Sequence, residues 1–274
     1  MRRLRACLSM GWMACLLLSG LAAAQEQADI PAHDVVPSKE QEGVVHVNAL
    51  RKPEMHAYRA IVAGLDKFDQ LHAMAPAVPR LVFVARSRGK GGGPLTGAAP
   101  TAKLSADGFS LPLPLDDTLH FTVPRNQQAW DSKAELVLSR KRREVMVWPD
   151  IRTPGLLENL RRLGDVRLEC QVLIAVAKEE VPFYIVAMVN TLILTTDWCS
   201  FMKDKDRTWS VAMPSKLASA TLRDGERTET LRVSGRDFHV PIGDTSLSND
   251  ALIEVVYAPE EAPAEAGAVA APTP

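Results

Sequence analysis

A repeated pattern of residues constrains the fold of this chain more than any other feature. Residues 121–138 recur in residues 238–255, at a constant offset of 117 positions, the separation of Phe121 from Phe238. The matching pairs are Phe121 and Phe238, Val123 and Val240, Pro124 and Pro241, Trp130 and Leu247, Ala134 and Ala251, Leu136 and Ile253, and Leu138 and Val255. Upstream, Asp107-Gly108 falls on Asp224-Gly225 at the same offset, which brings the identities to six. The pattern predicts an internal duplication of one strand-rich module.

Periodicity supplies the elements of each module. Apolar and polar residues alternate over 109–115 and 119–123, as in half-buried strands, and Asp224-Gly225 is a typical hairpin turn. Apolar residues at spacings of three and four predict an amphipathic helix from about Glu54 to Met74, with Pro53 at a position where a first helical turn tolerates a missing amide. We therefore predict an α+β fold of two tandem related modules, each an antiparallel sheet with one packed helix.

Two apolar runs in the second half leave an alternative open. Residues 168–177 form a long apolar run, which predicts a strand. Residues 183–194 could form a buried strand or a helix, and the acids and proline at 179–182 favour a helix. If residues 183–194 form a strand, the chain would be a pair of tandem β-sandwich modules.

The first residues have the pattern of a cleaved export signal. Arginines at 2, 3 and 5 precede an apolar stretch over 6–21 and three alanines at 22–24. We predict a periplasmic or secreted protein with no transmembrane span after signal cleavage. The expected order is signal peptide 1–24, disordered leader 25–43, first module 44–148, connection 149–165, second module 166–258 and a disordered Ala/Pro/Glu tail at 259–274.

Two cysteines remain after removal of the signal, Cys170 and Cys199. An even pair in an oxidising compartment predicts a disulfide between them, with two buried free thiols as the alternative. Closing a loop of about 30 residues would stabilise the fold by roughly 3 to 4 kcal/mol in the chain-entropy model.

A basic run separates the apolar residues 134–138 from 145–148. It consists of Arg140, Lys141, Arg142 and Arg143, and it would be the turn of a hairpin with those residues as its arms. It could bind anionic lipid or polyanionic glycan, or be a solvated turn. The formal net charge of −1 does not indicate a nucleic-acid partner.

Local motifs nominate no catalytic, metal or cofactor site. The glycine-rich stretch at 86–94 lacks the Ser or Thr that a P-loop needs after its Lys, and no Gly-x-Ser-x-Gly occurs. A triad can still assemble across space, so His120 or His239 beside an acid in a pocket would indicate an enzyme. Trp130, Trp148, Trp198 and Trp209 could stack on sugars or belong to the core.

We therefore expect a non-catalytic periplasmic binding or structural protein with its cleft between the modules. One alternative is an envelope hydrolase with a spatially assembled site. Another is an envelope adaptor that binds anionic lipid or glycan through the basic run. The expected partners are an envelope protein, a glycan or anionic lipid, and not nucleic acid.

Overall fold

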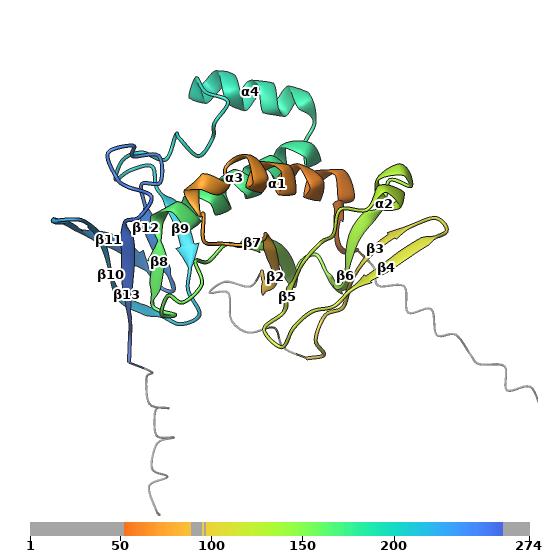
Figure 1. Ribbon diagram of the computed structural model, residues 1–274, viewed down its shortest axis with the longest axis horizontal. Helices are drawn as coiled ribbons and strands as arrows, with labels where there is room; N and C mark the ends of the chain where they lie inside the picture. Colours follow the sequence, from red (N-terminus) through yellow and green to blue (C-terminus); the bar gives the residue numbers. More distant parts are fainter. Residues whose placement is uncertain (1–51, 89–94, 96, 260–274) are drawn as a thin grey trace, which may run out of the picture. The chain divides into compact units, whose positions relative to one another are not determined.

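The protein is a mixture of helices and antiparallel sheets, which confirms the predicted α+β class (Figure 1). The computed structural model describes residues 52–88, 95 and 97–259, all within one compact unit that begins at Asn48. The predicted signal peptide and leader, the first residues of the predicted first module, most of the glycine-rich stretch and nearly all of the tail lie outside the described residues.

The first half contains two separate sheets and one long helix. Its elements are β1 (Pro53–Ala57), α1 (Tyr58–Gln70), a 3-10 turn (His72–Met74), β2 (Val82–Ser87), β3 (Ala102–Ala106), β4 (Phe109–Leu113), β5 (His120–Phe121), α2 (Gln127–Asp131), β6 (Glu135–Lys141) and β7 (Val145–Asp150). The strand orders are β1-β6-β3-β4 in one sheet and β5-β2-β7 in the other.

The second half places its strands in one sheet of order β8-β13-β10-β11-β12-β9. Its elements are β8 (Leu160–Arg162), α3 (Leu163–Glu180), α4 (Phe183–Ile193), β9 (Trp209–Ala212), β10 (Leu217–Asp224), β11 (Arg227–Ser234), β12 (Asp237–Val240) and β13 (Leu252–Tyr257). Residues 183–193 are thus helical, as the acids and proline before them favoured.

Pairing in the two halves follows the same order along the chain. In the first half, β1 leads into the long helix and pairs with β6. In the second half, β8 leads into the long helix and pairs with β13. Strand β6 then pairs with β3, the first strand of the β3–β4 hairpin. Strand β13 likewise pairs with β10, the first strand of the β10–β11 hairpin. Gly108 and Gly225 make the two hairpin turns with φ of +70° and +59°, a region that suits glycine. The helices α1 and α3 follow β1 and β8 directly.

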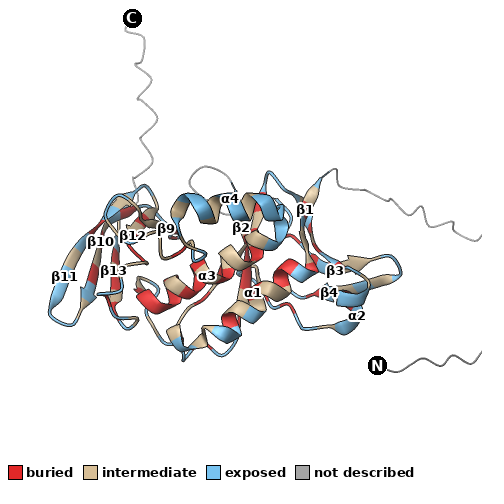
Figure 2. Cartoon of the chain, turned by 90° about the horizontal axis from the view of Figure 1, so that it is seen from above, coloured by how far each residue is buried: buried red, intermediate tan, exposed pale blue. Residues whose placement is uncertain are grey.

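The prediction of a strand at 168–177 is wrong, because these residues lie in α3. Helix α3 is shared by two hydrophobic cores: Leu168, Val172 and Val176 pack with the first half, and Val166 and Cys170 with the second. A helix that is buried on opposite sides has apolar residues all round, so its sequence loses the amphipathic period. Figure 2 shows buried residues, in red, along α3.

Two further predictions need correction. Residues 54–57 belong to β1 rather than to the helix, because they pair with β6 from Glu54 to Ala57, and proline is tolerated at the first residue of an edge strand. Arg142 and Arg143 of the basic run do lie in a turn, but Arg140 and Lys141 end β6, and the flanking strands make no hairpin: β6 pairs with β1 and β3, whereas β7 pairs with β2. The chain changes sheets at this turn.

Candidate functional site

A cavity of about 790 Å³ lies between elements of the two halves. The first half contributes β2, the turn at residues 118–119 and β7 to its walls. The second half contributes Glu169 of α3, β9 and the turn that leads into β12. A volume of this size suits a drug-sized organic ligand.

Two tryptophans from opposite halves meet in the wall of this cavity. The ring centroids of Trp148 on β7 and Trp209 on β9 lie 6.1 Å apart, with an angle of 33° between the planes. Met146, Met213 and Leu119 add apolar surface. Such a wall can bind the apolar body of a ligand by burial and by stacking.

A cluster of charged groups surrounds Asp150 at the end of β7. Its carboxylate lies 3.0 Å from Nη2 of Arg86, 3.2 Å from Nε of Arg152 and 3.0 Å from Nε2 of His120. Burial alone would raise the pKa of Asp150, but the hydrogen bond from His120 and the charges of Arg152, Arg161 and Arg86 hold it below its usual range. Arg86 and Arg152 also line the cavity.

A second, fully buried ion pair lies behind this cluster. Nη2 of Arg161 is 2.9 Å from Oε1 of Glu169, and both side chains are almost inaccessible to solvent. Glu169 also accepts a hydrogen bond from the amide of Ile151 at 3.1 Å, and burial raises the pKa of its carboxyl. Nε and Nη1 of Arg161 have no hydrogen-bond partner among the described residues.

The two arginines that line this end of the cavity share one carboxylate. Arg86 and Arg152 both pair with Asp150, whereas the buried Arg161 pairs with Glu169 and also interacts with the buried Asp165. Burial lowers the pKa of Arg86, as expected of a cation whose charge is incompletely compensated. An anion at Arg86 and Arg152 would therefore find a favourable potential.

His120 stands between Asp150 and a tightly bonded turn. Its Nδ1 lies 2.8 Å from Oγ1 of Thr118, whose hydroxyl donates to Oδ1 of Asp116 at 2.7 Å. The hydrogen bond to Asp150 raises the pKa of His120. His239, the other histidine weighed in the sequence, lies on β12, where burial lowers its pKa.

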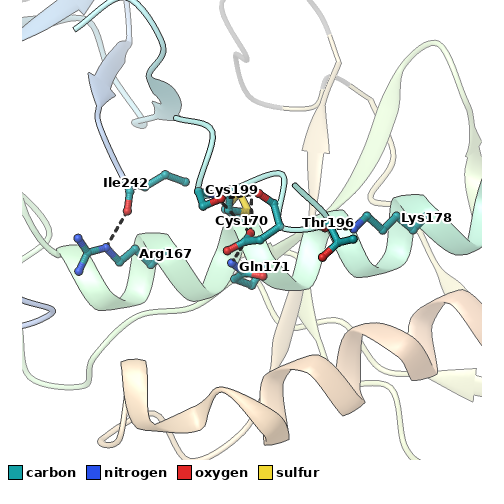
Figure 3. Close-up of a disulfide and its surroundings, with 9 residues drawn as sticks. Arg167, Cys170, Gln171, Lys178, Thr196, Cys199 and Ile242 are labelled. Atoms are coloured by element: carbon teal, nitrogen blue, oxygen red, sulfur yellow. Dashed lines mark hydrogen bonds between the residues drawn. A yellow bond between two sulfur atoms is a disulfide. The ribbon is translucent and has the colours of Figure 1, made fainter. Parts of the chain in front are cut away.

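Figure 3 shows the disulfide that joins Cys170 of α3 to Cys199. It closes the loop that carries α4. On the same loop, Nζ of Lys178 donates to the carbonyl of Thr196 at 2.6 Å, and Gln171 donates to Asp197 at 2.9 Å. The disulfide therefore anchors the loop that carries α4, which is separate in sequence from the cavity residues of β2 and β7.

Acids offset part of the positive charge of the basic run. Arg140 and Lys141 pair with Glu144 at 3.4 and 4.0 Å, and Arg142 lies 3.9 Å from the buried Glu54. Arg143 is exposed. These ion pairs reduce the net charge that the run presents to an anionic lipid or glycan.

Sequence reasoning missed most of the charged cluster. His120, Trp148 and Trp209 were considered, but Arg86, Asp150, Arg152, Arg161 and Glu169 were not. One signal was available: Glu169 stands between Leu168 and Cys170 in an apolar stretch, and a charged residue is buried only with a partner.

Comparison of the chain with protein-family models, curated proteins and solved structures finds no match to any of the three. In the part of the chain that the structure describes, no group of three or more His, Cys, Asp or Glu side chains is placed to hold a metal ion.

Proposed function

We propose that this chain is an exported, non-catalytic binding protein whose cavity takes a small amphiphilic anion. The observation that carries the proposal is the pairing of Trp148 and Trp209 with the surplus positive charge at Arg86 and Arg152 in one cavity. The tryptophans would cover the apolar body of the ligand. Its carboxylate, sulfonate or phosphate would lie against the two arginines, where charge-assisted hydrogen bonds are strong.

The cavity would lie between two copies of a duplicated module. The matching strand orders β1-β6-β3-β4 and β8-β13-β10-β11 support this, as do the helices that follow β1 and β8. Strands β5 and β12 contain the matching residues Phe121 and Phe238. Strand β2 pairs with β5 and β9 pairs with β12, so β2 and β9 also correspond. The second copy would then begin at β8, inside the predicted connection. Superposition of the two strand sets in an experimental structure tests the duplication, and different paths of the paired strands would contradict it.

Export is part of the proposal and has two supports. Residues 1–24 have the pattern of a cleaved signal, and a disulfide is typical of an oxidising compartment such as the periplasm or the cell exterior. Mass spectrometry of the mature chain recovered from periplasm or medium tests it. An N-terminus at Gln25 supports export, and an uncleaved chain in the cytoplasm contradicts it.

A pair of probes that differ only in charge tests the ligand class. 8-Anilinonaphthalene-1-sulfonate has an aromatic body and one sulfonate, whereas N-phenyl-1-naphthylamine has the same rings and no charge. We expect titration of the secreted chain, followed by probe fluorescence, to show tighter binding of the sulfonate. Arg152→Gln should weaken only the sulfonate, by about tenfold or more, because a hydrogen bond to a charged group contributes about 1.5 to 3 kcal/mol.

Two further variants separate the cavity from other surfaces. Trp209→Ala should weaken both probes, since it removes part of the apolar wall. Arg223→Gln changes an exposed arginine that pairs with Glu254 outside the cavity, and it should change neither affinity. Equal binding of the two probes, or binding that survives both cavity changes, would contradict the proposal.

A hydrolase is the second candidate, because His120 lies beside an acid. The chain Thr118–His120–Asp150 has the connectivity of a triad, with separations of 2.8 and 3.0 Å. However, the Thr118 hydroxyl donates to Asp116, so His120 must donate from both ring nitrogens, and an imidazolium cannot act as a base. The amides of Thr118, Leu119 and His120 all donate to Asp116 within the turn, so none of them is available to an oxyanion.

Hydrolysis of p-nitrophenyl acetate by the secreted chain distinguishes the two candidates. A binding protein should show the same background rate as its His120→Gln variant at pH 7 to 9. A rate that falls by a hundredfold or more in that variant, but not in His239→Gln, would favour the hydrolase.

A further inference from the structure

Helix α4 presents a large apolar surface to solvent. None of its residues is buried, and Figure 2 shows it as exposed or half-exposed along its length. The exposed fraction is 84% for Phe183, 73% for Leu192 and 89% for Leu194, which caps the helix. Tyr184 and Met188 are also exposed. These five residues form what we call the α4 patch.

The composition of this segment does not suit an exposed helix. Residues 181–196 contain no charged side chain, and the polar side chains of α4, Asn190 and Thr191, both make hydrogen bonds within the chain. A helix that is apolar all round is normally buried in a protein or a membrane. The eleven residues of α4 extend only about 16 Å, roughly half of a hydrocarbon core. No described helix is both long and apolar enough to span a bilayer.

The area of the α4 patch is close to the area that each partner buries in a stable protein interface. Given about 150 to 250 Å² for each large side chain, the exposed fractions leave about 500 to 900 Å² of mainly apolar surface. The largest apolar patch of a typical monomer is about 300 to 600 Å², whereas a standard interface buries about 800 Å² on each partner. The patch with a modest polar rim would therefore suffice for a dimer.

We propose that the α4 patch is the interface of a homodimer, in which α4 packs against α4 of a second copy of this chain. A two-fold dimer brings the same surface of each copy together, and a patch without charge meets its own copy without repulsion. A bilayer surface fits less well. Interfacial helices carry Lys and Arg on a polar face, whereas the charges next to this run are mainly the acids Glu179, Glu180 and Asp197.

The attachment of α4 favours a defined interface. The Cys170–Cys199 disulfide closes the loop, Lys178 holds the carbonyl of Thr196, and Nε1 of Trp198 donates to Oδ1 of Asn190 at 2.8 Å. A helix that is already held in place loses less conformational entropy on association than a free segment does.

Sedimentation equilibrium of the secreted chain over about 1 to 100 µM tests the dimer. We expect a dimer for the natural chain, and a dissociation constant at least tenfold weaker for Phe183→Ser/Leu192→Ser, since apolar anchors dominate interfaces. Leu157→Ser, which changes an exposed leucine outside α4, is the matched control and should remain dimeric. A natural chain that is monomeric at 100 µM would overturn the proposal.

A cross-link and a lipid assay complete the test. Met188→Cys lies on the exposed face of α4 and should form a disulfide-linked dimer on mild oxidation, whereas Leu157→Cys should not. Flotation with phosphatidylcholine and phosphatidylglycerol vesicles should leave the chain unbound. Equal cross-linking of the two cysteine variants, or flotation that the Phe183→Ser/Leu192→Ser change abolishes, would overturn the proposal. Because these readouts do not involve the cavity, they fail independently of the ligand proposal.

Discussion

A histidine between two acids should make the stability of this protein fall in alkaline solution. His56 on β1 lies 3.1 Å from the buried Glu54 through Nε2, and its Nδ1 bonds to Glu180 at the end of α3. Burial alone would lower the pKa of His56, but the hydrogen bonds to Glu180 and Glu54 raise it to about 9 from 6.5. The imidazolium therefore links β1 to α3.

The sign and size of the effect follow from proton linkage. The folded state binds this proton more tightly than the unfolded state, so the stabilisation is complete below pH 6.5 and is lost as the pH rises through about 9. A shift of this size corresponds to about 3 kcal/mol at most, and about 2 kcal/mol of it should disappear between pH 7 and 9.5. The His56 side chain is only 15% exposed, so solvent screens little of this interaction.

Urea unfolding at pH 7 and 9.5 measures this loss. The natural chain should lose about 2 kcal/mol more unfolding free energy over this range than His56→Gln does. At pH 7, His56→Gln should already be less stable by a similar amount. His239→Gln is the control, since burial lowers the pKa of His239 and the residue is neutral across the range. Equal pH dependence in the natural chain and His56→Gln would refute the assignment.

Three further changes should lower stability in ways that urea unfolding can measure. Replacement of Cys170 and Cys199 by Ser should cost about 3 kcal/mol, and an unchanged unfolding midpoint would contradict a stabilising role for the disulfide. Gly164→Ala should cost on the order of 3 kcal/mol, because its methyl group would meet a backbone carbonyl oxygen at 2.1 Å, and natural stability would show that the site can relax. Glu169→Gln should cost about 3 to 5 kcal/mol, since it leaves Arg161 charged and buried without its partner, and a cost below 1 kcal/mol would contradict the buried pair.

Several strands and turns could be predicted from the sequence, because their patterns are local. The alternation over 109–115 corresponds to β4 (Phe109–Leu113), and Asp224-Gly225 is the turn between β10 and β11. The turns at Gly108 and Gly225 need a positive φ, which glycine adopts without strain. These features depend on neighbours in the chain, so periodicity and turn chemistry suffice.

Helix α3 and the cavity depend on contacts that the sequence does not display. Residues 168–177 resemble a strand because α3 is buried from two sides, a fact of tertiary packing. Arg86 meets Asp150 only because β2 pairs with β7, and Trp148 meets Trp209 only because the two halves approach each other. No local sequence pattern indicates contacts between residues so far apart in the chain.

A crystal structure of the protein with a brominated alkyl carboxylate, such as 12-bromododecanoate, tests the proposed binding site most directly. Anomalous scattering locates the bromine, and the electron density locates the carboxylate. We expect the carboxylate within hydrogen-bonding distance of Arg86 or Arg152 and the alkyl chain along Trp148 and Trp209. A cavity that holds only water, with the ligand absent or bound elsewhere on the surface, would contradict the proposed binding site.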